Sequence, residues 1–238
     1  MLARQSLTEQ RYHIALSLKG KRCLLAGFGA VGKRKLARLL AMGDAGPEAI
    51  LVLDPNLPDC QEDSLLQAAT VHGKRQKVSC QDLDVHLVFA CTGSKEENAR
   101  IARLCAERGI LCNCASDPAL GDVQLPALIN CPPLTITLST QGASPALAKK
   151  WRLELEQWAA KKRPILCLMA WLRPKILALG LPQAENRRLF TSLAQGPLED
   201  WLACGQRQKA SDYLLALLPQ ALHKDLQSLF SEQTEVWI

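Results

Sequence analysis

The sequence predicts an α/β fold: a Rossmann-like parallel sheet, then a small α+β region, then a helical C-terminal part. Short apolar runs alternate with amphipathic helical segments through the first half of the chain, which is typical of a parallel, doubly wound sheet. A glycine-rich turn joins the first apolar run to the first helix, and the pattern is helical throughout from residue 144 onward. We therefore expect three parts, at residues 1–113, 114–150 and 151–238.

The first strand–turn–helix–strand unit ends at Asp54. Arg22–Ala26 is predicted as a buried strand, and the turn Gly27-Phe28-Gly29-Ala30-Val31-Gly32 follows it directly. The next residues repeat apolar side chains with helical spacing. A second strand, Ala49–Leu53, then leads to Asp54, so that a complete β-turn-α-β unit is present.

The glycines of this turn meet the requirements of a dinucleotide-binding loop. Gly27 allows the tight turn, Gly29 lets the backbone approach a pyrophosphate, and Gly32 permits close packing of helix and strand. The helix N-terminus offers free N–H groups and the positive end of its dipole to the phosphates. All six residues of the turn are therefore candidate cofactor-binding residues. The alternative is a glycine-rich turn that holds no ligand.

Three residues outside the turn are also expected at the cofactor. Asp54 lies 22 residues after the last glycine of the turn, where a carboxylate can accept hydrogen bonds from the ribose hydroxyls. It would repel a 2′-phosphate, and Pro55 and Asn56 rather than an arginine follow it, so the sequence favours NAD over NADP. Thr92 and Gly93 follow a later strand and either line the cofactor or form a plain loop.

The later elements of the first half follow from local signals. Val85–Ala90 is predicted as a further strand. Ser94 and Glu97 form a capping-box pair that opens a helix. Ile110–Cys112 begins the next strand after that helix.

Beyond residue 113 the pattern changes. Val123–Ile129 and Leu134–Ser139 are predicted as two strands, the second with strict alternation of apolar side chains and threonine. Ser144 at the N-cap and Pro145 at the first helical position then start a helix. An apolar stripe runs along it: Leu147, Trp151, Leu155 and Trp158. The helical region is expected to be interrupted at Pro164, Gly180, Gly196, Gly205 and Pro219.

Composition and charge narrow the classes of protein. The 238 residues are 48% hydrophobic and 22% charged, which is typical of a globular protein, and no apolar run reaches the roughly 18 residues that span a bilayer. The net charge of +6 suits nucleic acid, an anionic membrane surface or a polyanionic small molecule, and charge alone does not decide between them. Aromatic residues make up only 5% and no nucleic-acid-binding signature occurs, so we expect neither a nucleic-acid nor a membrane partner.

The ten cysteines and the N-terminus indicate the compartment. The cysteines show no paired framework and are expected to be reduced thiols in core positions. Cys112 and Cys114 form a close pair, but no second pair or nearby histidine completes a zinc site, so no metal is expected. The first ten residues are too polar for a secretory signal, so we expect a cytoplasmic protein.

Several segments together resemble the precorrin-2 dehydrogenase family, a kind of domain also found at the N-terminus of siroheme synthases. The resemblance covers residues 11–160. Its segments are residues 12–21 ("YHIALSLKGK"), residues 27–35 ("GFGAVGKRK"), Cys112-Asn113, Pro118, residues 125–127 ("LPA") and residues 139–152 ("STQGASPALAKKWR"). The last segment is far more specific than the glycine turn.

The resemblance implies an NAD-dependent oxidation of precorrin-2 to sirohydrochlorin, and some members of the family also insert ferrous iron. It further implies a homodimer, in which residues 114–150 form a swapped dimerisation region and the C-terminal helices cover the tetrapyrrole cleft. Precorrin-2 is a polycarboxylate, so basic and hydrogen-bonding side chains are expected to bind it. The candidates are Ser139, Thr140, Gln141, Ser144, Lys149 and Arg152. For the basic residues the alternative is a solvated helix face.

One departure from the family pattern bears on catalysis. Three residues after Asn113 the family commonly has an aspartate, its usual candidate for proton removal and metal handling, whereas this chain has Ser116. A serine without a partner is not basic at neutral pH, so Ser116 could orient the substrate but hardly act as a base. Asp117, the other candidate catalytic residue, would point to the opposite face of a strand unless a loop brings it round. We therefore expect a dehydrogenase with weak or no chelatase activity.

Two alternatives remain open at this point. The first is a bifunctional enzyme that also inserts ferrous iron into sirohydrochlorin. The second is an NAD-binding regulatory module that keeps the glycine turn and has lost its chemistry, as Ser116 would allow. The segment "GASPALA" (residues 142–148) argues against the second, because a sensor of NAD has no need of another anion-binding region.

Overall fold

The computed structural model describes residues 11–231 and divides the chain into two compact units, one ending at Leu125 and the other beginning at Pro126. The first ten residues, from which we expected no secretory signal, lie outside the described residues. Within the described part, no helix combines the length and the apolar character that crossing a bilayer requires. The expected division into three parts at residues 113 and 150 stays a prediction.

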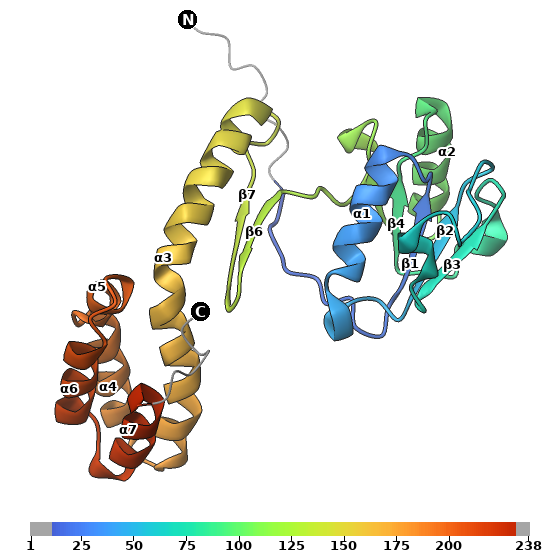
Figure 1. Cartoon of the computed structure of the whole chain (residues 1–238). Helices are drawn as coiled ribbons and strands as arrows, with labels where there is room; N and C mark the ends of the chain where they lie inside the picture. The colour runs from blue at the N-terminus through green and yellow to red at the C-terminus, as the bar shows by residue number, and fades with distance from the viewer. Residues whose placement is uncertain (1–10, 232–238) are drawn as a thin grey trace, which may run out of the picture. The chain divides into compact units, whose positions relative to one another are not determined.

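The first unit is a five-stranded parallel sheet with a helix on each face, which confirms the Rossmann-like prediction (Figure 1). The strand order is β3-β2-β1-β4-β5. The strands are β1 (Arg22–Ala26), β2 (Ala49–Leu53), β3 (Val71–Lys74), β4 (Leu87–Ala90) and β5 (Leu111–Cys114), and the helices are α1 (Ala30–Leu40) and α2 (Lys95–Ala106). Four 3-10 turns connect them: η1 (Gly43–Ala45), η2 (Ser64–Gln67), η3 (Cys80–Asp82) and η4 (Pro118–Leu120).

The central strand β1 is buried on both faces, which explains its continuous apolar run. Leu25 packs in the cluster that contains Leu36 of α1, and Leu24 packs in the cluster that contains Ile101 of α2. All four side chains are fully buried. Because successive side chains of a strand point to opposite faces, one short strand anchors both helices.

The edge strand β3 was not predicted from the sequence. Its sequence is Val71-His72-Gly73-Lys74, of which only Val71 is buried, so it carries neither an apolar run nor an alternation. It forms because β2 offers a parallel partner, with Ile50 opposite Val71 in the register. Pairing with an existing strand, rather than a local preference, therefore decides this element.

The capping box predicted at the start of α2 is only half formed. Ser94 Oγ accepts a hydrogen bond from Glu97 N at 3.1 Å, as expected. The Glu97 carboxylate, however, binds the guanidinium of Arg100 at 2.7 and 2.9 Å. The Ser94 N–H donates to Thr92 Oγ1 at 3.3 Å instead. A charged partner within reach on the same helix thus takes Glu97 away from the backbone.

The second unit begins with an antiparallel hairpin, β6 (Ala127–Cys131) and β7 (Leu134–Leu138), with Ala127 opposite Leu138. The predicted strand at Val123–Ile129 was wrong in its start. The Val123 N–H donates to the Cys112 carbonyl at 2.9 Å, so this residue continues from the first unit instead of entering the hairpin.

The rest of the second unit is helical, as expected. Its elements are α3 (Pro145–Ala178), α4 (Gln183–Gln195), α5 (Leu198–Ala203), α6 (Arg207–Leu217), η5 (Gln220–Leu222) and α7 (His223–Ser231). The expected interruptions near Gly180, Gly196, Gly205 and Pro219 are confirmed. Figure 1 shows the shorter helices gathered beside the C-terminal half of α3.

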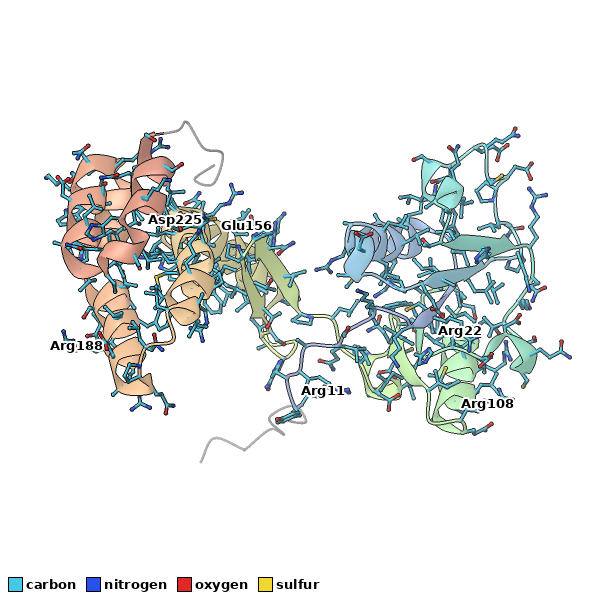
Figure 2. The ribbon with its side chains drawn as sticks, turned by 90° about the horizontal axis from the view of Figure 1, so that it is seen from below. Arg11, Arg22, Arg108, Glu156, Arg188 and Asp225 are labelled. Atoms are coloured by element: carbon cyan, nitrogen blue, oxygen red, sulfur yellow. The ribbon has the colours of Figure 1, made fainter. Side chains whose placement is uncertain are left out.

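The predicted interruption at Pro164 was wrong, because α3 continues through Pro164 and Pro174. Each proline removes a backbone donor and strains the preceding turn. Apolar residues that follow Pro164 at helical spacing offset this cost, because they are buried in one core shared with the shorter helices: Ile165, Leu168, Leu172 and Ile176. Lys175 of α3 also binds the Asp225 carboxylate of α7 at 2.7 Å (Figure 2 labels Asp225).

All ten cysteines are free thiols, as expected. Cys23, Cys91, Cys105, Cys112 and Cys114 are buried in the first unit. Burial raises the pKa of the Cys23 and Cys91 thiols to about 11, because the charged thiolate is disfavoured away from water. The expectation that all ten fill the core was wrong for the exposed ones: Cys60, Cys80 and Cys204.

The core of the second unit supplies a stability test. Leu168 is fully buried, so Leu168→Ala should lower the free energy of unfolding by about 2–5 kcal/mol. Leu177→Ala, on the half-exposed side of the same helix, should change it by less than about 0.5 kcal/mol. All five tryptophans of the chain lie after residue 150, so urea unfolding followed by tryptophan fluorescence reports on this unit. Equal losses in the two variants would contradict the assigned packing.

Candidate dinucleotide site

The glycine turn between β1 and α1 has little free space at two of its glycines. Gly27 has a φ of +96°, and a Cβ there would lie 2.6 Å from the Cys91 carbonyl oxygen. A Cβ on Gly32 would lie 2.0 Å from the carbonyl oxygen of Gly27. Gly29 is different, since apart from the residue itself and its two chain neighbours no described atom lies within 4 Å of its Cβ position. The turn is therefore closed toward the protein and open above Gly29, as the close approach of a pyrophosphate requires.

The N-terminus of α1 faces this open space. Gly29 is its N-cap, and among the described residues no side chain caps it and no acidic residue occupies its first turn. The first-turn N–H groups and the helix dipole are therefore left for an anion. Lys33 flanks the turn, with its ammonium 4.9 Å from the centre of the Phe28 ring and 2.6 Å from Asp63 Oδ2.

Asp54 lies beside the turn, at the end of β2. Its Oδ2 accepts a hydrogen bond from Phe28 N at 2.7 Å, and its Oδ1 accepts one from Asn56 N at 2.8 Å. From the sequence, Asp54 was expected to contact ribose, and its contact with the turn was not predicted. Each carboxylate oxygen has a further lone pair, so Asp54 can hold the turn and still accept from ribose hydroxyls.

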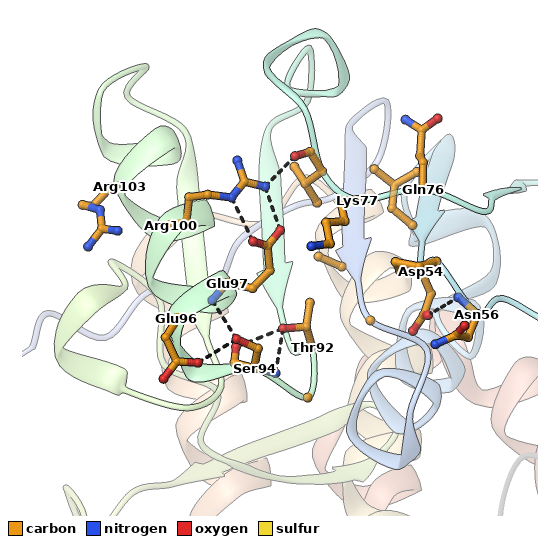
Figure 3. Close-up of a pocket in the computed structure, with 16 residues that line it drawn as sticks. Asp54, Asn56, Gln76, Lys77, Thr92, Ser94, Glu96, Glu97, Arg100 and Arg103 are labelled. Atoms are coloured by element: carbon orange, nitrogen blue, oxygen red, sulfur yellow. Dashed lines mark hydrogen bonds and ion pairs between the residues drawn. The ribbon is translucent and has the colours of Figure 1, made fainter.

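A pocket of about 550 Å³ adjoins Asp54 (Figure 3). Figure 3 shows Asp54 and Asn56 on one side of it and Thr92, Ser94 and Glu97 on the other. Thr92 and Gly93 both line it. Their contact with a cofactor stays a prediction. The pocket lies at the carboxyl ends of β1, β2 and β4, where open α/β sheets bind their ligands.

Several polar residues of the pocket were not predicted as site residues, among them Gln76, Lys77, Arg100 and Arg103. Gln76 and Lys77 follow the unpredicted strand β3, and no local motif marks them. Arg100 is fixed by Glu97 and by the Val78 carbonyl, to which it donates at 2.6 Å. The hydrogen bond from Arg100 holds the pKa of the Glu97 carboxyl below its usual range.

The two candidate catalytic residues have different surroundings. Ser116 is partly buried just after β5, with its Oγ 3.3 Å from Asn98 Nδ2 and 3.6 Å from Cys114 Sγ. Asp117 is exposed, and its Oδ1 accepts from Ala119 N at 3.0 Å as the N-cap of η4. Within the first unit, Ser116 therefore belongs to the network at the sheet edge, and Asp117 supports the following turn.

The segment that follows Asp117 is held by the guanidinium of Arg11. Arg11, labelled in Figure 2, donates to the carbonyl oxygens of Pro118, Gly121 and Asp122 at 2.9–3.1 Å. A Cβ on Gly121 would lie 2.7 Å from the Cys112 carbonyl oxygen. Charged hydrogen bonds and close backbone packing thus fix this segment against β5.

The residues expected to bind the substrate lie in the second unit. Ser139 Oγ accepts from Gln141 N, and Thr140 Oγ1 binds the backbone of Ser144. Ser144 Oγ accepts from Leu147 N at 3.2 Å and caps α3, as predicted. These hydroxyls shape the turn before α3, in which Gln141 has a φ of +50°.

The two basic candidates on α3 differ in their surroundings. Lys149 is exposed, whereas Arg152 forms an ion pair with Glu156 one helical turn later. The surroundings of Arg152 match the alternative of a solvated helix face. Across residues 11–231, no group of histidine, cysteine and acidic side chains is arranged to hold a metal ion.

The turn open at Gly29, the uncapped helix and the carboxylate beside the pocket fit a dinucleotide. They define the class of the first unit as a dinucleotide-binding domain on a doubly wound parallel sheet. Residues 14–127 match a family model described as "Putative NAD(P)-binding". The matched segment contains the glycine turn, Asp54 and strands β1 to β5.

Comparisons over the whole chain point to a narrower group. The siroheme synthase of Azotobacter vinelandii is 33% identical over 220 residues, which cover 90% of this chain and 46% of that protein. The siroheme synthase of Pseudomonas entomophila is 32% identical over 206 residues, which cover 86% and 43%. The chain is thus homologous to siroheme synthases along most of its length, and it spans less than half the length of these relatives.

A solved structure supports the same fold. The structure titled "SirC, precorrin-2 dehydrogenase" matches with a TM-score of 0.64 over 93% of this chain and 99% of that chain. The identity between the two is 21%, so this likeness concerns the fold.

Two glycine substitutions should separate cofactor contact from packing. Gly29→Ala should leave the unfolding midpoint unchanged, because its φ of −72° suits alanine and its Cβ meets open space, but it should weaken NAD binding about tenfold or more. Gly32→Ala should instead destabilise the first unit by about 1–3 kcal/mol. Calorimetric titration with NAD and thermal unfolding check both. Unchanged NAD binding by Gly29→Ala would contradict the assigned turn.

Asp54 should matter for NAD through both of its contacts. Asp54→Ala removes the acceptor for Phe28 N and the expected ribose acceptor. The apparent dissociation constant for NAD, measured by calorimetric titration, should therefore rise about 10- to 100-fold. Asp54→Asn keeps one acceptor oxygen and should give an intermediate value. An unchanged constant in Asp54→Ala would show that the carboxylate does not contact the cofactor.

Proposed function

We propose that this protein catalyses the NAD-dependent dehydrogenation of precorrin-2 to sirohydrochlorin, in the biosynthesis of sirohaem or related tetrapyrroles. The observation that carries the proposal is the homology to siroheme synthases over 90% of the chain, together with the dinucleotide site of the first unit. NAD supplies the hydride acceptor of this oxidation. The contribution of the protein is then to hold the cofactor at the sheet edge and to bind the substrate beside it.

The residues at the pocket favour NAD over NADP. The Asp54 carboxylate stands where the adenosine ribose is expected and would repel a 2′-phosphate. Lys77, Arg100 and Arg103 also line the pocket, but Asp54, Glu96 and Glu97 are there to offset their charge. The pocket therefore has no excess of positive charge to bind the 2′-phosphate of NADP.

Residues 114–150, which run from the end of the first unit into the second, are proposed to form the dimerisation region, and residues 151–238 are proposed to cover the tetrapyrrole. A homodimer is supported by large apolar side chains of β6 and α3 that are 39–49% exposed in the single chain: Leu128, Leu147, Trp151, Leu153 and Trp158. Lys149 and the hydroxyl-bearing turn before α3 are proposed to meet carboxylates of precorrin-2. The free thiols suit a cytoplasmic location.

Chelatase activity is proposed to be weak or absent. Insertion of ferrous iron requires the removal of pyrrole protons, for which a carboxylate is a suitable acceptor and an isolated serine is not. Ser116 occupies the position at which the family commonly has its aspartate, and Asp117 is engaged as the cap of η4. Dehydrogenation needs chiefly the correct placement of cofactor and substrate, with the proton passing to water or to a substrate carboxylate, so it tolerates this change.

The main test uses purified full-length protein with enzymatically prepared precorrin-2 and NAD. The absorption spectrum of sirohydrochlorin should develop only when NAD is present, and Asp54→Ala at the same NAD concentration should slow it. NAD binding without any spectral change would overturn the dehydrogenase proposal in favour of a non-catalytic NAD-binding module.

A second test concerns ferrous iron. Metal insertion into sirohydrochlorin should be no faster with the protein present than in the uncatalysed control. Ser116→Asp should raise that rate, because the amide N–H of Asn98 that reaches Ser116 Oγ can equally donate to a carboxylate there. Fast insertion by the unchanged protein would show a bifunctional enzyme and contradict the assigned role of position 116.

A further inference from the structure

Asn98 is one of the few buried polar residues of the first unit, with 2% of its surface exposed. Its Oδ1 accepts from Thr92 N at 2.9 Å and from Thr92 Oγ1 at 2.8 Å. Its Nδ2 donates to Thr92 O at 3.1 Å and to Ser116 Oγ at 3.3 Å. One side chain of α2 therefore ties together the residues that follow β4 and β5.

The direction of these hydrogen bonds is determined by the backbone of Thr92. The Thr92 N–H can only donate, so it requires the amide oxygen of Asn98 opposite it. The Thr92 carbonyl can only accept, so it requires the amide nitrogen. The orientation of the amide group is thus fixed, and Ser116 Oγ necessarily receives an N–H from Asn98.

This arrangement leaves the hydroxyl hydrogen of Ser116 for another acceptor. The neighbouring acceptor in the structure is Cys114 Sγ at 3.6 Å, and sulfur accepts hydrogen bonds only weakly. A carbonyl oxygen of a ligand would compete with it readily. Ser116 is therefore prepared to act as a hydrogen-bond donor, which is the opposite of the role of a general base.

The position of Ser116 indicates which part of a dinucleotide it meets. Asp54 follows β2 and the glycine turn follows β1, whereas Thr92 and Ser116 follow β4 and β5 on the other side of the turn. With the adenosine ribose at Asp54 and the pyrophosphate at the turn, the nicotinamide half lies toward β4 and β5. The carboxamide of the nicotinamide is the group there with a carbonyl acceptor.

We infer that Ser116 donates a hydrogen bond to the nicotinamide carboxamide and that Asn98 is the positioning residue that directs it to do so. The inference rests on the proposed binding of NAD. On this inference, Ser116, which stands where the family commonly has its aspartate, helps to hold the cofactor. The amide group of Asn98 keeps both Ser116 and the loop at Thr92 in one orientation.

Binding of NAD and of ADP-ribose, which lacks the nicotinamide, tests this directly. Calorimetric titration of the full chain should show that Ser116→Ala weakens NAD about three- to tenfold and leaves ADP-ribose unchanged, since one neutral hydrogen bond is lost. Ser116→Thr keeps the hydroxyl and should bind NAD more nearly as the unchanged protein does. Equal effects of Ser116→Ala on both ligands, or no effect on either, would overturn the inference.

Asn98→Ala tests the positioning role. Asn98→Ala should weaken the binding of NAD more than the binding of ADP-ribose. Adding Ser116→Ala to it should cause no further loss of NAD affinity relative to ADP-ribose, because the two residues act through one hydrogen bond. Additive selective losses would contradict the role of Asn98. If Asn98→Ala does not fold, Ser116→Ala and Ser116→Thr still decide the assignment of Ser116. Failure of the unchanged protein to bind either ligand would refute NAD binding itself, a result distinct from a failure of the inference.

Discussion

The close approach of the glycine turn to its neighbours is the constraint on which the rest of the first unit depends. Side chains at Gly27 and Gly32 would collide with the backbone of Cys91 and of the turn itself. Their absence lets α1 start directly above the end of β1, so that its N-terminus faces the sheet edge. Phe28 then lies where its N–H meets Asp54 of the neighbouring strand. A tight turn and a correctly placed carboxylate are therefore parts of one arrangement.

Buried amide side chains extend this arrangement to the other strands. Asn98 joins the ends of β4 and β5 through Thr92 and Ser116. Asn113 of β5 donates to the Val123 carbonyl at 2.7 Å and accepts from Lys35 of α1 at 2.6 Å. Burial lowers the pKa of Lys35, and the contact with Asn113 supplies a partner for its ammonium. Fully satisfied networks of this kind hold a sheet edge rigid, which a site for a two-part cofactor requires.

Much of the first unit could be predicted because its signals are local. The apolar run of β1, the glycines and the N-cap Ser94 each act within a few residues, and their predicted structures are present. Strand β3 could not be predicted, because it lacks a local strand pattern and forms by pairing with β2. Nor could the passage of α3 through Pro164, which depends on the burial of Leu168 and its neighbours against helices formed later in the chain.

By itself the sequence determined the class of the first unit and the position of its glycine turn, because glycine spacing and strand–helix alternation are properties of neighbouring residues. The tertiary structure decided what surrounds that turn. It brought Lys77 from the segment after β3 into the pocket with Asp54, and it placed Asn98 against Ser116, 18 residues further along the chain. Parallel strands gather their carboxyl ends at one edge of the sheet, so residues distant in sequence meet there only once the sheet has formed.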